Sequence, residues 1–126
     1  MVGWVLASLA IAGLVAIGVA GMLAPRRAAG EYGIVLDDDR ALGLIRAMAA
    51  RDLVIGGLLA LIAWAAARET LGWAMGATAL IAVVDLGVVT TDRRATSRTR
   101  MDRIVALHGG GAVGLLAAGA VLLAGC

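Results

Sequence analysis

The chain has 126 residues, of which 62% are hydrophobic and 16% are charged. Soluble domains average about 45–50% apolar and about 25% charged residues, so this composition excludes an ordinary soluble domain. It predicts one all-α integral membrane domain over residues 1–126, because the chain is too short for two independent domains. The formal net charge of +2 reflects arginines that flank apolar segments, which indicates membrane topology and no nucleic-acid partner.

Four apolar segments are long enough for transmembrane helices, each of which needs about 20 residues. The first, from Val2 to Ala24, is uncharged and stops at the breaker and cations of Pro25-Arg26-Arg27. In chain order, the predicted helices lie at about 2–24, 41–67, 71–91 and 101–124.

The predicted connections indicate the relative directions of the four helices. Polar loops at 25–40 and 92–100 lie on one side, here called the loop side, and a very short turn at 68–70 lies on the terminal side with both chain ends. Asp39 is a candidate N-cap for the second helix, at the end of the acidic run Asp37 to Asp39. Short connections favour antiparallel neighbours, so we expect a four-transmembrane-helix up-down bundle.

Arginines and tryptophans predict how the bundle is oriented. Arg68 is the arginine of the terminal side, whereas the loop side holds Arg26, Arg27, Arg40, Arg93, Arg94, Arg98, Arg100 and Arg103. By the positive-inside rule, the loop side is cytoplasmic and both termini lie on the non-cytoplasmic side. Trp4, Trp64 and Trp73 fall near the terminal side, as half of an aromatic belt.

Two glycine patterns indicate close helix packing. Gly72-x-x-x-Gly76 and Gly110-x-x-x-Gly114 have the spacing that lets helix backbones approach in a membrane. This spacing is compatible with packing inside the bundle and with a homo-oligomer.

Asp52 and Asp85 lie inside predicted spans, where a carboxylate costs roughly 3 kcal/mol on insertion scales. At 1.5 Å per residue, they lie roughly 22 Å and 21 Å from the terminal side. In a hydrocarbon core about 30 Å thick, both are therefore near the loop side. His108 is expected just inside the same face. A charged pair at one level of a bundle is a candidate site.

The direction of the Arg51 side chain determines whether Asp52 and Asp85 form a site with it. Successive helix residues differ by about 100° in direction, so Arg51 either reaches inward past Asp52 or extends to cytoplasmic headgroups. A purely structural interpretation is an interhelical ion pair, for example Arg51 with Asp85. The structural alternatives for three other candidates are helix packing for His108, a membrane-surface anchor for Arg46 and a headgroup-level loop position for Tyr32.

Several of these residues together resemble a known family. The pattern is Pro25, Tyr32-Gly33, Ala50-Arg51-Asp52, Gly56-Gly57, Arg68, Leu71-Gly72 and Asp85. It resembles a family of small four-helix membrane proteins classed as a domain of unknown function, and more distantly the DoxX-like proteins. Some fungal members are assigned as epoxide hydrolases of polyketide pathways, so the resemblance implies epoxide chemistry.

The leading hypothesis is a membrane-embedded enzyme that acts on a lipophilic small molecule by acid–base catalysis. Its sharpest form is epoxide hydrolysis, or epoxide-opening cyclisation or isomerisation, because an arginine between two carboxylates can keep one ionised while burial keeps the other protonated. The predicted catalytic residues are Asp52, Asp85, Arg51, His108 and Tyr32, and the predicted substrate-binding residues are Arg46 and Gly56.

Two other classes of protein remain open. A small oligomeric proton-coupled transporter or channel would need its carboxylates accessible from both faces, and an accessory scaffold would need no chemistry. The sequence has no nucleotide loop, metal-ligand cluster or haem motif, so we expect no cofactor and no metal. The single cysteine, Cys126, excludes thiol oxidoreductases that use a cysteine pair within one chain. The expected partners are the lipid bilayer, a hydrophobic substrate and a second copy of the chain.

Overall fold

The computed structural model describes residues 1–31, 41–91 and 98–125, and over these ranges the regular structure is all helical. The helices are α1 (Val2–Leu23), α2 (Pro25–Glu31), α3 (Ala41–Ala65), α4 (Arg68–Thr91) and α5 (Arg98–Leu123). All except α2 are long and apolar enough to cross a membrane. The predicted helical class and its four long helices are confirmed.

Helix α2 corrects the prediction of a polar loop from Pro25 onward. Ala24, at φ −131°, breaks α1, and its carbonyl then accepts the N–H of Ala28 at 3.0 Å, so the chain re-enters a helix at once. Pro25 suits the first position of a helix because its φ is preset and no N–H is required there. Ala29 of α2 is buried against Ile45 of α3, which fixes the short helix to the bundle.

The turn between the second and third long helices is shorter than predicted. Helix α3 ends at Ala65, and α4 begins at Arg68, where a turn was expected. Leu71 N–H donates to the carbonyl of Ala67 at 3.3 Å, and Glu69 lies in the first turn, where an acidic side chain favours the helix dipole. Helix α5 likewise begins at Arg98, earlier than expected, and the proposed cap Asp39 lies outside the described residues.

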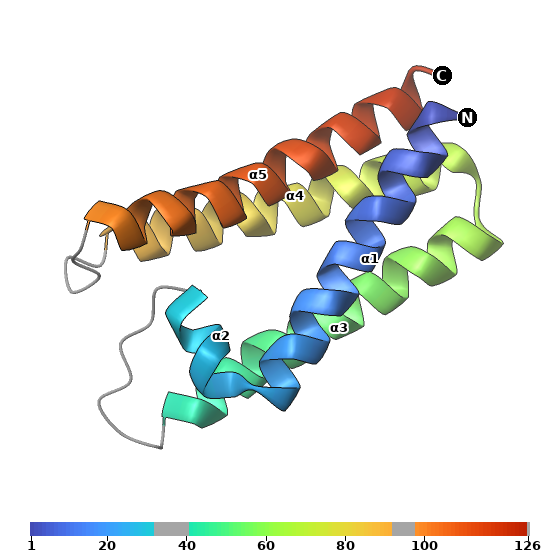
Figure 1. Cartoon of the computed structure of the whole chain (residues 1–126). Coiled ribbons are helices and arrows are strands. Elements are labelled where there is room, and N and C mark those ends of the chain that lie inside the picture. Colours follow the sequence, from blue (N-terminus) through green and yellow to red (C-terminus); the bar gives the residue numbers. More distant parts are fainter. Residues whose placement is uncertain (32–40, 92–97, 126) are drawn as a thin grey trace.

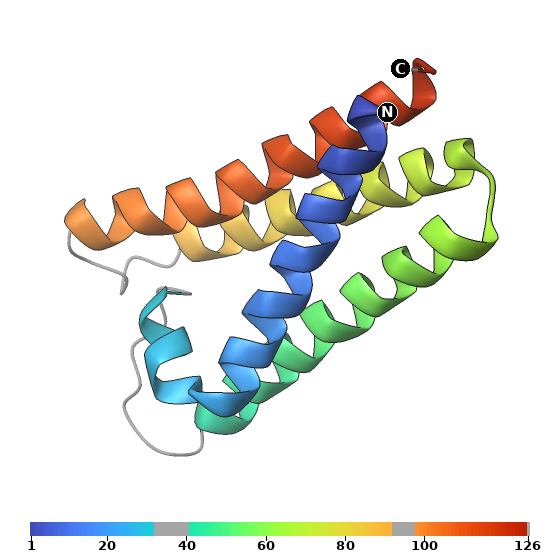
Figure 2. The same ribbon diagram turned by 45° about the vertical axis from the view of Figure 1, so that its right-hand side comes forward.

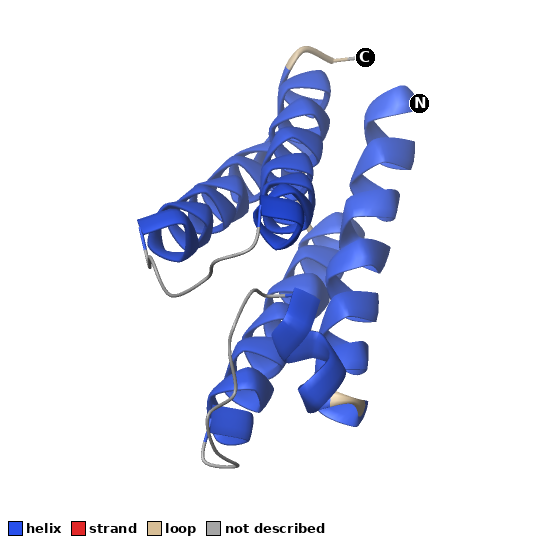
Figure 3. Ribbon diagram, turned by 60° about the vertical axis from the view of Figure 1, so that its left-hand side comes forward, coloured by secondary structure: helices blue, strands red, loops and turns tan. Residues whose placement is uncertain are grey.

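The four long helices form two antiparallel pairs, α1 with α3 and α4 with α5 (Figure 1). Both termini and the α3–α4 turn lie at one end, and the pairs diverge toward the other end, as a second view also shows (Figure 2). Seen nearly along α5, the two pairs remain separate layers, with α2 beside the α1–α3 pair (Figure 3).

The main core holds the two pairs together near the terminal end. Ala7 of α1 and Leu59 of α3 pack there with Leu71 and Met75 of α4 and Leu122 of α5. All five are at most 2% exposed. Because this contact lies toward one end, the diverging half of the bundle is where a pocket between the pairs can open.

Glycines allow the close approach within each pair. A Cβ on Gly119 would lie 2.8 Å from the carbonyl oxygen of Gly72, and a Cβ on Gly18 would lie 2.8 Å from that of Ala49. Gly72 therefore packs closely as predicted, but its partner is on α5. Gly76 belongs to the same contact, because a Cβ on Gly119 would lie 3.5 Å from its backbone nitrogen, whereas a Cβ on Gly110 or Gly114 would meet nothing within 4 Å.

Large apolar side chains cover the outside of the bundle. Trp64 and Trp73 are 85% and 71% exposed, and Trp4 is 39% exposed. Leucines and valines of all four long helices are exposed in the same way, for example Leu9, Leu58, Val84 and Leu116. Large exposed apolar surfaces mark sites of membrane or protein interaction, and four helices long and apolar enough to span a membrane carry them here.

Candidate active site

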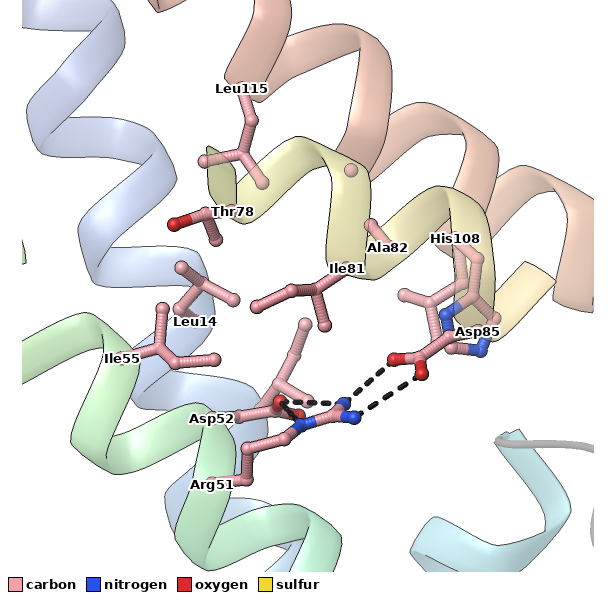
Figure 4. Close-up of a pocket in the computed structure, with 13 residues that line it drawn as sticks. Leu14, Arg51, Asp52, Ile55, Thr78, Ile81, Ala82, Asp85, His108 and Leu115 are labelled. Atoms are coloured by element: carbon pink, nitrogen blue, oxygen red, sulfur yellow. Dashed lines mark hydrogen bonds and ion pairs between the residues drawn. The ribbon is translucent and has the colours of Figure 1, made fainter. Parts of the chain in front are cut away.

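One guanidinium, that of Arg51, contacts both carboxylates that the sequence singled out. Its Nη2 and Nη1 donate to Asp85 Oδ2 and Oδ1 at 2.7 and 3.2 Å. Its Nη2 and Nε donate to Asp52 Oδ1 at 3.1 and 3.3 Å. Asp52 and Asp85 therefore lie at one level of the bundle, joined by an arginine between α3 and α4 (Figure 4).

Helix geometry explains how adjacent residues of α3 can share this site. Asp52 faces the interior and is 7% exposed, and one turn further Gly56 is buried against Val15 and Leu14 of α1. Arg51 lies about 100° around the helix from Asp52. Its long side chain nevertheless reaches back across the helix, so its interaction is with α4 inside the bundle.

The three charged residues border a pocket between the two helix pairs. Its walls are Leu14, Ile17, Arg51, Asp52, Ile55, Thr78, Ile81, Ala82, Asp85, Leu107, His108, Gly111 and Leu115. All four long helices contribute, and the space open to the centres of water-sized molecules is about 80 Å³. Small-molecule sites typically have mainly apolar walls and a few convergent polar groups, and this pocket has both.

His108 joins the polar end of the pocket from α5. It is 9% exposed, and it lines the same pocket as Asp85 (Figure 4). Both carboxylates are near enough to interact with it electrostatically. The arrangement thus brings together four of the five predicted catalytic residues from three helices. They are the carboxylates Asp52 and Asp85, the guanidinium of Arg51 and the imidazole of His108.

Within the described part of the chain, no three His, Cys, Asp or Glu side chains gather as metal ligands. The chemistry that these side chains can themselves supply is proton transfer. Arginine stays protonated in proteins and donates hydrogen bonds in a rigid planar fork. Arg51 therefore holds two carboxyl groups within reach of one bound molecule, and two such groups can act as an acid and a base.

A family model described as "Domain of unknown function (DUF4267)" matches residues 11–122. The chain belongs to the DUF4267 family. The match includes the whole segment from Pro25 to Asp85 that carried the resemblance, which confirms a family of unknown function. No curated protein and no solved structure matches the chain.

Other predicted site residues of this DUF4267 chain lie elsewhere. Arg46 is exposed on α3 and is not part of the pocket wall. Gly56 packs against α1, also outside the wall, so its contribution is to bring α1 close to the Asp52 face. Tyr32 lies outside the described residues.

Thr78 is a pocket residue that the sequence reasoning did not find. It is 8% exposed and lines the pocket on α4, two helical turns before Asp85. This spacing puts both side chains on one face of the helix. This spacing could have identified Thr78 from the sequence. A polar side chain on the same helix face as a carboxylate within a membrane span is a candidate for the same site.

Proposed function

We propose that this protein is a membrane-embedded enzyme that opens an epoxide on a neutral lipophilic molecule, with Asp52, Arg51 and Asp85 as the acid–base array. The observation that carries the proposal is that one guanidinium holds carboxylates from two helices on the wall of an apolar pocket. The nucleophile is water or a hydroxyl of the substrate itself, which gives hydrolysis or cyclisation.

The membrane part of the proposal is supported by four apolar helices and an exterior of exposed leucine, valine and tryptophan. The arginine distribution supports a cytoplasmic loop side, and hence a site near the cytoplasmic face with both termini outside. A lipophilic substrate would reach such a pocket from the bilayer, and water would reach it from the loop side.

The carboxyl groups divide the two proton transfers that epoxide opening needs. The base takes a proton from water while the water oxygen bonds to one epoxide carbon. The bond between that carbon and the epoxide oxygen breaks, and the acid gives its proton to that oxygen, so that a diol forms. The base is then protonated and the acid ionised, and transfer of one proton between them, directly or through water, restores the array.

Geometry suggests which carboxyl has which role. Arg51 donates to both oxygens of Asp85, at 3.2 and 2.7 Å, and to Oδ1 of Asp52, at 3.3 and 3.1 Å, and Asp85, which receives the shortest of these bonds, is assigned the base. The Asp52 side chain is 10% exposed against 20% for Asp85, and this more buried carboxyl is assigned the acid. His108 lines the same end of the pocket and interacts electrostatically with both carboxylates.

Turnover of a straight-chain terminal epoxide by the purified protein in lipid nanodiscs tests the proposal. Asp52→Asn and Asp85→Asn keep the shape of each side chain and remove its acid–base function, so each is expected to lower turnover at least about 100-fold. Asp102→Asn is the matched control, since Asp102 is exposed on α5 outside the pocket. A double Asp52→Asn, Asp85→Asn variant with full turnover would refute the proposal. Proton-coupled flux in proteoliposomes without epoxide turnover would instead indicate a transporter.

A further inference from the structure

The polar end of the pocket has a counterpart at its other end, Thr78. Figure 4 shows Thr78 near Leu14 and Leu115, away from Arg51 and Asp85. Its hydroxyl donates to the carbonyl of Ala74 at 2.9 Å, one turn earlier in α4. A hydroxyl has one donor and two acceptor positions, so Thr78 can offer a bound molecule only an acceptor.

The distance between the two polar ends of the pocket sets the length of a molecule that can contact both. Thr78 and Asp85 are two turns apart on one face of α4, which corresponds to about 10 Å along the helix. Between them the wall is aliphatic, formed on three helices by Leu14, Ile55 and Ile81 (Figure 4). A molecule that spans the pocket therefore needs an apolar middle.

Formal charge restricts what can lie at the Arg51 end. Two carboxyl groups share one guanidinium there, so the formal charge of this end is zero with only Asp85 ionised and negative with both ionised, and it does not attract an anion. A fatty-acid carboxylate or a lipid phosphate would approach the like charge of the Asp85 carboxylate in an apolar pocket, where such repulsion is costly. The pocket therefore favours a neutral ligand.

We infer that the substrate is a neutral amphiphile with its reacting group at Arg51 and a hydroxyl or N–H donor about 10 Å away, which Thr78 accepts. The inference rests on the proposed function for the identity of the reacting group. Thr78 then determines specificity: it selects molecules that have a donor at the correct distance and fixes the orientation of the chain between the two polar ends.

The probes are straight-chain terminal epoxides, from butyl to dodecyl, each with and without a hydroxyl at the far end. In the wild-type protein, kcat/KM is expected to be about tenfold higher for the hydroxylated chain at one intermediate length, as one added hydrogen bond provides. Thr78→Val is nearly isosteric and is expected to abolish this preference, whereas Thr78→Ser retains the hydroxyl and preserves it.

Thr90 provides a matched control on the same helix. Its hydroxyl makes the same kind of bond, to the carbonyl of Leu86 at 2.8 Å, but it is exposed and outside the pocket. Thr90→Val removes that bond and is expected to leave the preference unchanged. An equal preference in wild type and Thr78→Val, or rates that do not depend on the far hydroxyl at any length, would overturn the inference.

Binding separates failure of this inference from failure of the proposed function. Diols corresponding to the same epoxides, with and without the far hydroxyl, are tested for thermal stabilisation of the protein. If no epoxide reacts but the hydroxylated diol selectively stabilises wild type over Thr78→Val, the proposed reaction is wrong and the Thr78 inference stands. If epoxides react but neither assay detects the far hydroxyl, the inference is wrong and the reaction stands.

Discussion

Arg51 of α3 and Asp85 of α4 are joined by two hydrogen bonds, of 2.7 and 3.2 Å, far from the short turn that connects their helices. The bond pair therefore links the two diverging helix pairs across the pocket. This link can stabilise the packing of the two helix pairs, and it also positions the carboxyl groups of the proposed acid–base array. Substitutions can test the first role separately from the second. A polar partner that is left alone in an apolar setting is destabilising, whereas replacement of both partners by apolar groups is tolerated.

We predict that Arg51→Met, which removes the cation shared by Asp52 and Asp85, lowers the free energy of unfolding by about 1–2 kcal/mol. Asp85→Leu is expected to cost less, about 1 kcal/mol, because Arg51 still bonds Asp52, and the double variant is expected to lose less than the sum of the two. The magnitude is below the 3–5 kcal/mol that is typical of fully buried pairs, because the Arg51 and Asp85 side chains are 37% and 20% exposed. Unfolding in mixed micelles by titration with a denaturing detergent measures it. Strictly additive losses would mean that the ion pair does not couple α3 to α4.

The contact between Gly72 and Gly119 predicts a second difference in stability. A methyl group on Gly119 would lie 2.8 Å from the backbone oxygen of Gly72, which cannot move without shifting α4. Gly119→Ala is therefore expected to cost about 1–3 kcal/mol through overpacking. Gly76→Ala is the control, because nothing lies within 4 Å of the added Cβ and alanine favours a helix. The same unfolding assay compares them, and equal stability of the two variants would contradict the α4–α5 packing.

Much of the fold was predictable because a bilayer imposes a simple length rule on apolar segments. The short helix α2 was missed for two reasons. Seven residues are too few for a periodic pattern, and Pro25 both stops one helix and starts another. The pairing of Gly72 with Gly119 was missed because glycine spacing within one helix shows only that this helix has a face lined by small residues. It does not show which other helix packs against that face.

The sequence predicts the level of the site residues along the bundle, but it does not predict the direction in which each side chain points around its helix. Helix rise is constant, so Asp52 and Asp85 could be placed at one level from the sequence. Whether Arg51 turned inward could not be decided, because its side chain is long enough to reach either the interior or the headgroups. Thr78 was overlooked because threonine in a membrane helix commonly bonds its own backbone, as it also does here.

The orientation of the chain in the membrane is the remaining prediction, and the sequence contains a natural reporter for it. Cys126 is the single cysteine and follows α5, on the terminal side that is expected to be outside. In intact spheroplasts, a membrane-impermeant maleimide is expected to label Cys126. Glu31 is exposed at the end of α2, so Glu31→Cys combined with Cys126→Ser places the reporter on the loop side. This variant should react only after permeabilisation, and the reverse labelling pattern would put the site on the outer face.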